Sequence, residues 1–392
     1  MPLPLYLLAL AVFAMGTSEF MLAGLLPDIA SELDVTVGTA GVLTSAFAIG
    51  MIVGAPLVAA LARDWPRRSS LLGFILAFTA AHAVGAVTTS FPVLFATRVV
   101  AALANAGFLA VALTAAATLV SPDKKGRALA VLLSGTTMAT IAGVPGGSVL
   151  GTLLGWRAAF WAVAALCLPA ALGILKGIPT GRAQEEATAG PALRAELAQL
   201  ARPRLILVML LGALVNAATF ASFTFLAPVV TDTAGLDELW ISVVLVLFGA
   251  GSFVGVTVAG RLSDQRPGLV IAVGGPLLLL GWPVLAMLAD KPVALFALVF
   301  VQGALSFALG STLITRVLYE ATEAPTMAGS YATAALNVGA AAGPLIAAAT
   351  LSTTAGTHGP LWASGLLVAV ALLIAFPLRT AIEADRSTEV LR

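Results

Sequence analysis

The sequence predicts an all-α integral membrane protein with twelve transmembrane helices, arranged as two six-helix halves that repeat one another in parallel. Composition, the spacing of apolar runs and an internal repeat lead to this prediction. Hydrophobic residues make up 60% of the 392-residue chain and charged residues only 10%, whereas soluble domains are about a quarter charged. The chain therefore belongs in a lipid bilayer. Its net charge of +1 gives no reason to expect a nucleic-acid partner.

Apolar runs recur along the chain and are separated by short polar segments. A run of about 20 residues is long enough to cross a bilayer as an α-helix. The runs are too long for the strands of a membrane barrel and do not alternate in polarity. The twelve predicted spans cover residues 3–26, 39–61, 69–88, 92–119, 128–152, 158–176, 205–230, 239–260, 269–288, 293–315, 328–352 and 360–378.

Basic residues predict the orientation of these spans. If the N-terminus is cytoplasmic, 17 of the 20 Lys and Arg residues lie in cytoplasmic segments. Only Arg157 and Lys291 fall on the other side, and Arg98 lies within a span. Because positive residues collect on the cytoplasmic side, we expect a multi-pass protein of the cell membrane with both termini in the cytoplasm.

The longest polar segment divides the spans six and six. It predicts a first half at 1–176, a cytoplasmic linker with a short interfacial helix at 177–204, a second half at 205–378 and a cytoplasmic tail at 379–392. The halves align at an offset of 201 residues, which pairs Pro27 with Pro228, Phe47 with Phe248, Gly50 with Gly251, Gly54 with Gly255, Leu61 with Leu262 and Pro66 with Pro267. In transporters built from parallel repeats, the substrate binds between the halves.

Two opposite charges, Glu19 and Arg98, lie deep within the predicted spans. An ionised side chain at the centre of a membrane helix costs about 2.5–3.5 kcal/mol on insertion scales, so such residues are functional by default. At the repeat offset, Glu19 corresponds to Phe220 and Arg98 to Val299. We therefore expect proton chemistry in the first half, with Glu19 as the proton carrier and Arg98 tuning its protonation. The alternative is a static buried ion pair that fixes helix packing.

Several stretches carry motif-like patterns. Residues 61–68 keep the basic pair of a loop motif, G-x-L-A-D-R-x-G-R-K, but place Arg63 where its acid belongs, and residues 260–266 follow that motif more closely. Arg98 begins a degenerate R-x-x-Q-G pattern, and Gly135 precedes Gly143-Val144-Pro145-Gly146-Gly147 with one residue inserted between Gly and Pro. These patterns resemble the major facilitator superfamily, specifically its twelve-helix drug:proton antiporters. Residues 16–30, 216–228 and 329–339 resemble actinomycete chloramphenicol-resistance exporters.

The resemblance implies the major facilitator fold and proton-driven efflux of chloramphenicol-like drugs by alternating access. An exporter of sugars or another endogenous metabolite is the alternative. The implied gating residues are Arg63, Asp64, Arg67, Arg68, Gly143, Pro145, Gly146 and Asp264. For the loop residues the alternative is a solvated positive-inside loop, and for the glycines it is a purely structural helix contact.

Polar and aromatic residues in the spans are candidates for drug binding, because a pocket for a neutral drug is mostly apolar with a few convergent polar groups. They are Asn105, Asn216, Phe220, Gln302, Tyr331 and Asn337. Each could equally be an interhelical hydrogen-bonding or packing residue. His82, with no evident partner, and the single cysteine, Cys167, are interpreted as structural residues.

No Ser/His/Asp set, metal-spaced His/Cys cluster or P-loop is evident in the sequence, so we expect a transporter and not an enzyme, a receptor or an ATP-driven pump. The proton is the only coupling ion expected, with no metal and no other cofactor. The expected partners are a small-molecule drug and the lipid bilayer, and the resemblance implies a monomer.

Overall fold

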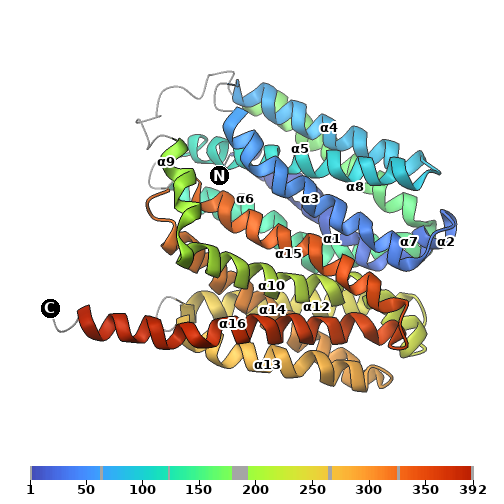
Figure 1. Cartoon of the computed structure of the whole chain (residues 1–392). Coiled ribbons are helices and arrows are strands. Elements are labelled where there is room, and N and C mark those ends of the chain that lie inside the picture. The colour runs from blue at the N-terminus through green and yellow to red at the C-terminus, as the bar shows by residue number, and fades with distance from the viewer. Residues whose placement is uncertain are drawn as a thin grey trace.

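The computed structural model describes residues 2–61, 65–121, 124–178, 193–263, 267–324 and 327–389. It confirms the predicted fold class, because twelve helices within these ranges are long and apolar enough to cross a membrane. They run side by side in one bundle (Figure 1). The elements are α1 (Leu3–Phe20), η1 (Met21–Gly24), α2 (Leu26–Glu32), α3 (Val37–Leu61), α4 (Arg67–Val87), α5 (Phe91–Thr118), α6 (Lys125–Met138), η4 (Ala139–Gly143), α7 (Val144–Leu154), α8 (Trp156–Gly177), α9 (Leu193–Ala198), η5 (Gln199–Ala201), α10 (Pro203–Thr224), α11 (Leu226–Pro228), η6 (Val229–Thr233), α12 (Leu239–Ser263), α13 (Pro267–Leu288), α14 (Pro292–Glu320), α15 (Ala328–Leu351), η7 (Gly356–His358) and α16 (Gly359–Glu389).

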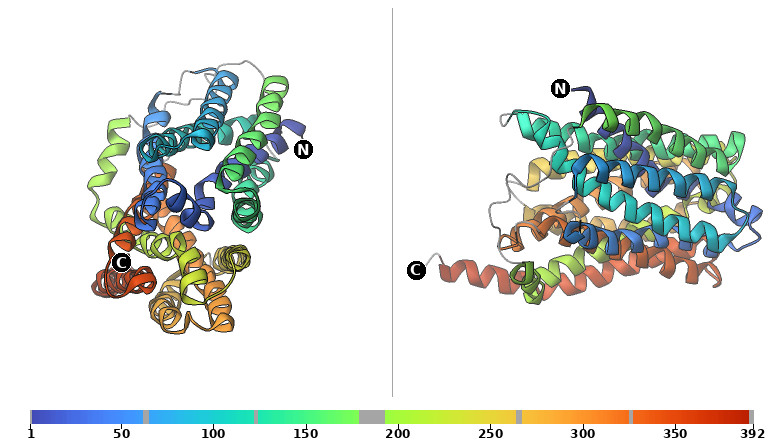
Figure 2. Two further views of the ribbon diagram at one scale, coloured as in Figure 1. Left: turned by 90° about the vertical axis from the view of Figure 1, so that its right-hand side faces the viewer. Right: turned by 90° about the horizontal axis from the view of Figure 1, so that it is seen from above.

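The helices form two groups around two hydrophobic cores. One core lies mainly among α1 to α8 and the other mainly among α10 to α16. Figure 2 shows the two groups end-on, with the blue-to-green helices of the first group beside the yellow-to-red helices of the second. The end of the bundle that carries α9 and the C-terminal part of α16 is termed the terminal end. The end that carries α2 and η7 is termed the opposite end.

The first helix of each group is interrupted at nearly the same repeat position, three residues apart at the offset of 201. α1 gives way to the 3-10 turn η1, and α10 ends at Thr224 before the short helix α11. Pro27 and Pro228 follow these interruptions. Proline lacks the N–H that would continue the helix, and its ring clashes with the carbonyl four residues earlier. The last bond of α1 runs from the Met21 N–H to the Thr17 carbonyl, so the Ser18 carbonyl, next to Glu19, lies just beyond the helical ladder.

The fifth predicted span is a single run in the sequence but three elements in the structure. α6 and α7 are joined by η4, a π-helical turn in which each bond reaches five residues along the chain. Pro145 opens α7 directly after this turn. The wider turn accommodates the one residue that this chain inserts into the glycine-proline motif.

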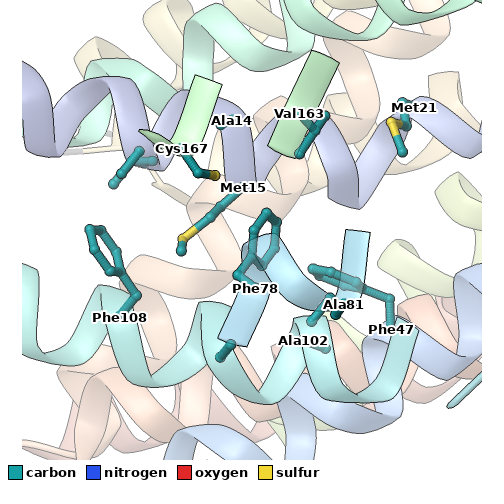
Figure 3. Packing of buried hydrophobic residues seen from close by; sticks show 14 of the residues in the cluster. Ala14, Met15, Met21, Phe47, Phe78, Ala81, Ala102, Phe108, Val163 and Cys167 are labelled. Carbon is teal, nitrogen blue, oxygen red and sulfur yellow. The ribbon is translucent and has the colours of Figure 1, made fainter. Parts of the chain in front are cut away.

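Glycines let this broken helix approach α1 closely. A Cβ atom on Gly135 would lie 2.4 Å from the Ala9 carbonyl oxygen, and one on Gly143 would lie 2.0 Å from the Thr17 hydroxyl. Such approach of two backbones is typical of small residues at membrane helix interfaces. α1 is therefore fixed between α6 and α7 on one side and the first core on the other, where Met15 points toward Phe78 and Phe108 (Figure 3).

Contacts between the two groups gather toward the opposite end. Ser45 of α3 donates a 2.7 Å hydrogen bond to the Ala341 carbonyl of α15. The rings of Phe20 and Phe220 lie 5.7 Å apart, and η4 and α7 pack on α12. Ser45 is near the start of α3 and Ala341 is in the second half of α15, so this seam lies beyond the middle of the bundle.

Helical structure is also present outside the twelve predicted spans, in the linker and in the tail. Within the predicted linker, α9 and η5 form a short helical segment just before α10. α16 continues past residue 378 and ends at Glu389, within the predicted tail (Figure 1). This extension contains Ala, Leu, Glu and Arg, which are good helix formers.

Gly135→Ala should destabilise the protein, because the added methyl group meets backbone and not a movable side chain. Overpacking of this kind costs about 1–3 kcal/mol, so the thermal unfolding midpoint in detergent should fall. The matched control is Gly146→Ala, because a Cβ atom there meets nothing within 4 Å. If both variants unfold at the wild-type temperature, the close contact between α1 and α6 does not contribute to stability.

Candidate functional site

Glu19 lies in the last turn of α1, immediately before the break at η1. It is partly exposed, while the preceding Ser18 is fully buried. Within the described ranges, its carboxylate has no hydrogen bond and no ion pair. Glu19 is thus a membrane-embedded acid that no neighbouring side chain holds in place.

Arg98 of α5 is buried beside Glu19, but it forms its hydrogen bonds with Ser18, the residue that precedes Glu19. Its Nη1 donates to the Ser18 hydroxyl at 2.7 Å and its Nη2 donates to the Ser18 carbonyl at 2.8 Å. The guanidinium also lies 4.6 Å from the ring centre of Phe47, a cation–π arrangement. The predicted pair is therefore brought together, with the charges attracting one another, although the carboxylate and the guanidinium do not form an ion pair.

His82 of α4, which has no evident partner in the sequence, also contacts Ser18. Its Nε2 lies 2.7 Å from the Ser18 hydroxyl, and its Nδ1 lies 2.9 Å from the Phe78 carbonyl oxygen. Its ring packs 4.2 Å from that of Phe78. Ser18 is the site residue that sequence reasoning missed. Its only signal was a hydroxyl placed directly before a membrane-embedded acid.

A cavity lies between the two groups of helices. Five phenyl rings line it together with Thr140, Val144, Thr219, Gly249 and Ser252; the rings are those of Phe20, Phe220, Phe223, Phe248 and Phe307. Its volume is only about 10 Å³, so a drug can enter only if side chains move. Phe20 adjoins Glu19 in the chain, so the cavity begins one residue from the acid.

Of the six residues predicted to bind a drug, Phe220 lines this cavity. Three others are asparagines whose amides donate hydrogen bonds within the bundle. Asn105 donates to the Met51 sulfur, Asn216 to the Leu336 carbonyl and Asn337 to the Thr333 carbonyl. Gln302 is fully buried beside α13, where its amide donates to the Leu278 carbonyl at 3.3 Å.

Tyr331, the sixth, lies at the terminal end and holds the linker helix. Its hydroxyl donates to the Glu196 carbonyl of α9 at 2.8 Å, and the Glu196 carboxylate accepts the Met327 N–H at 2.9 Å. Glu196 is only 1% exposed, and its negative charge lies at the N-terminus of α15, where the helix dipole favours an anion.

An exposed ion pair between Arg202 and Glu323 lies next to this contact. The hydrogen bond from Arg202 holds the pKa of Glu323 below its usual value of 4.5. The pair therefore persists at neutral pH and is lost only as the pH falls through that lowered pKa. Exposed pairs contribute little to stability, so we attribute the docking of α9 to the buried contacts of Glu196.

The predicted gating residues are only partly within the described ranges. Arg63, Asp64 and Asp264 lie outside them. Arg67 and Arg68 form the first turn of α4 and are partly buried. Gly143, Pro145 and Gly146 lie at the junction of η4 and α7, on the helix that faces both α1 and α12.

At the opposite end, acids from both groups approach one another. Asp28 of α2 lies near Glu32 and near Glu238, which precedes α12. Burial raises the pKa of Asp28, and both neighbouring carboxylates raise it further. Ionised Asp28 therefore opposes the contact at this end. Throughout the described ranges, no three His, Cys, Asp or Glu residues are grouped to hold a metal ion.

Comparison with known proteins agrees with this architecture. The family profile of the Major Facilitator Superfamily matches residues 8–334. The chain is 81% identical to a chloramphenicol resistance protein of Streptomyces lividans, with 100% of both chains covered. It is 33% identical to the inner membrane transport protein YdhP of Escherichia coli K12, over 95% of each chain.

A solved structure shares the fold at low sequence identity. It is the crystal structure of a bacterial homolog of the human lysosomal transporter Spinster, in an inward-facing and unoccupied conformation. The TM-score is 0.74 at 17% identity, and the alignment covers 95% of this chain and 94% of the other.

Tyr331→Phe should loosen the linker helix, because it removes the hydrogen bond to the Glu196 carbonyl. A hydrogen bond worth about 1 kcal/mol corresponds to roughly fivefold faster amide hydrogen exchange in α9. Mass-spectrometric exchange on the purified protein measures this rate. Tyr319→Phe is the matched control, because Tyr319 is 65% exposed. Unchanged exchange in Tyr331→Phe would show that this bond does not hold α9.

Proposed function

Because the chain belongs to the Major Facilitator Superfamily, we propose that it exports chloramphenicol-like drugs across the cell membrane in exchange for protons. The observation that carries this proposal is the 81% identity, over both whole chains, to the Streptomyces lividans chloramphenicol resistance protein. In this proposal the protein acts as a monomer with both termini in the cytoplasm, where the positively charged segments lie.

The arrangement of the halves supports alternating access. The cavity lies between them, and their contacts gather toward the opposite end. In parallel-repeat transporters, one half rocks against the other around a fixed central site. The drug would enter from the terminal end in this conformation and leave after the seam at the opposite end opens.

The lining of the cavity suits a neutral aromatic drug. Chloramphenicol carries a nitrophenyl ring, hydroxyls and an amide, and its ring would stack on the phenyl rings of the cavity. Thr140, Thr219 and Ser252 each donate their hydroxyl proton to a carbonyl of their own helix. A hydroxyl has two lone pairs, so these oxygens remain acceptors for the hydroxyl and amide hydrogens of the drug.

Glu19 is the proposed proton carrier. It is partly exposed next to the cavity residue Phe20 and is not locked in an ion pair. A proton from outside would neutralise Glu19 as the drug leaves, and release of that proton to the cytoplasm would accompany capture of the next drug. Arg98 supplies a fixed positive charge that stabilises the carboxylate between these events.

The proton gradient provides enough energy for this exchange. A membrane potential of 100 mV contributes about 2.3 kcal/mol per charge, and one pH unit contributes about 1.4 kcal/mol. One proton per neutral drug molecule would then sustain a drug gradient of roughly 500-fold.

Glu19→Gln should abolish uphill efflux, because an amide cannot carry the proton. We expect cells expressing wild-type protein to extrude radiolabelled chloramphenicol and to stop when an uncoupler is added. Cells expressing Glu19→Gln at the same membrane level should match the uncoupled wild type. Asp290→Asn, an exposed acid-to-amide change in the loop before α14, is the control and should export normally.

The outcomes separate the parts of the proposal. Normal export by Glu19→Gln would place proton coupling at another residue. If wild-type protein exports no chloramphenicol but exports a sugar or a cellular metabolite, the assigned substrate class is wrong.

Phe220→Ala should weaken drug binding, because it removes a ring from the second-half wall of the cavity. An aromatic contact contributes about 0.5–1.5 kcal/mol, so KM for chloramphenicol should rise roughly two- to tenfold while membrane insertion is retained. Phe253→Ala is the control, because Phe253 lies on α12 but is 50% exposed on the outside of the bundle. Equal KM values for the two variants would exclude this cavity as the binding site.

A further inference from the structure

We propose that Ser18 and His82 are positioning residues that hold the Arg98 guanidinium beside Glu19 without letting the two charges pair. This inference rests on the proposed proton coupling. Ser18, His82 and Arg98 come from α1, α4 and α5, and their exposed fractions are 0%, 2% and 1%. No bulk water reaches these groups, so each hydrogen bond among them has a defined direction.

The hydrogen bonds have one consistent assignment. A carbonyl only accepts, so the proton of His82 lies on Nδ1 and is donated to the Phe78 carbonyl. Nε2 then accepts the Ser18 hydroxyl proton, and the lone pairs of that hydroxyl face the Arg98 Nη1 donor. A doubly protonated His82 would turn the Ser18 proton away from Nε2 and would place a second cation in the same buried space.

His82 therefore sets the direction of the Ser18 hydroxyl. Serine and threonine hydroxyls in helices commonly donate to a carbonyl of the preceding turn, as the neighbouring Thr17 does to the Phe13 carbonyl at 2.8 Å. His82 draws the Ser18 proton away from the helix and toward α4. The hydroxyl oxygen is thereby presented to Arg98 as an acceptor.

The break in α1 supplies the second acceptor. The last backbone hydrogen bond of the helix runs from the Met21 N–H to the Thr17 carbonyl. The Ser18 carbonyl is therefore the first that lies beyond the helical hydrogen bonds. Carbonyls at the end of a helix need partners from elsewhere, and Arg98 Nη2 donates to this one at 2.8 Å. Together the two Ser18 oxygens occupy one nitrogen each of the guanidinium.

The consequence concerns Glu19. With each Nη nitrogen donating one hydrogen bond to Ser18 and its face covered by Phe47, Arg98 supplies charge to the site from a position in which it is not paired with the carboxylate. Glu19 can therefore gain and lose a proton without breaking a buried ion pair. The Nε of Arg98 has no hydrogen-bond partner among the described residues. If Ser18 no longer presented its hydroxyl, Arg98 would be free to turn toward Glu19 and trap it as a carboxylate.

The test compares His82→Phe, His82→Gln and Ser18→Ala in proteoliposomes. Phenylalanine keeps the ring that packs on Phe78 and Phe160 but cannot accept the Ser18 proton, whereas the glutamine carbonyl can. Two reactions are measured with chloramphenicol: uptake driven by an imposed pH gradient, and drug–drug exchange without a gradient. His358→Phe, at the other histidine of the chain, is the control.

We expect His82→Phe and Ser18→Ala to lose roughly tenfold or more of the proton-driven turnover, as for loss of a hydrogen bond to a charged group. KM and drug–drug exchange should stay within about twofold of wild type, and His82→Gln should restore most of the driven turnover. Normal driven turnover in His82→Phe would overturn the inference. The inference would also be overturned if both reactions fell together and less protein were folded. Failure of His82→Gln to restore the driven turnover would overturn it as well.

A second measurement does not depend on transport. Solid-state NMR of protein labelled with ¹⁵N-arginine reports the mobility of the Arg98 guanidinium, whose signals are identified by their absence in Arg98→Lys. These signals should broaden or shift in His82→Phe and Ser18→Ala and return in His82→Gln. Unchanged signals would overturn the inference. If the signals change as expected but wild-type protein does not transport chloramphenicol, the proposed function fails and the positioning roles stand.

Discussion

A buried guanidinium that receives no water must take its partners from protein, and Arg98 imposes this requirement on the first half of the molecule. It needs acceptors, and the break between α1 and η1 provides the Ser18 carbonyl at the required place. It needs a second acceptor of fixed direction, and His82 on α4 orients the Ser18 hydroxyl toward it. Three helices are therefore held in register by one charge. Because the partners are dipoles and an aromatic ring, the charge of Arg98 remains unpaired and acts on Glu19 from beside it.

The two halves share a backbone plan but differ in chemistry at equivalent positions. Phe220 occupies the repeat position of Glu19, and Val299 occupies that of Arg98. Phe47 covers the guanidinium in the first half, whereas its counterpart Phe248 lines the cavity and packs 4.8 Å from Phe223. Some equivalent positions of the repeated scaffold are thus charged in the first half and apolar or aromatic in the second. Residues of both halves meet where Phe20 faces Phe220 across the seam.

The twelve spans could be predicted from the sequence, because the hydrocarbon core of a bilayer requires long apolar helices. It also identified Glu19 and Arg98, because isolated charges stand out in such runs. It could not assign Ser18 or His82, whose roles depend on α1, α4 and α5 meeting at one point. Asn216 and Asn337 were natural candidates as polar residues, yet in the bilayer an amide is also used to satisfy nearby carbonyls. Phe220 was a candidate from the sequence, but the other four phenyl rings of the cavity resemble in sequence rings that face lipid or core, so only packing distinguishes them.

The π-helical turn at η4 determines which way the glycines of the fifth span point. In an α-helix each residue advances by about 100°, so eight residues overshoot two full turns by roughly 80°. Gly135 and Gly143 are eight residues apart, yet both contact α1, because the wider turn between them absorbs the overshoot. Deleting one residue from η4 would leave the two glycines seven residues apart, and seven residues of regular α-helix turn through about 700°, only about 20° short of two full turns. The glycines would then still share one face, so the extra residue of the π-helical turn lengthens this span without changing the face that it presents to α1.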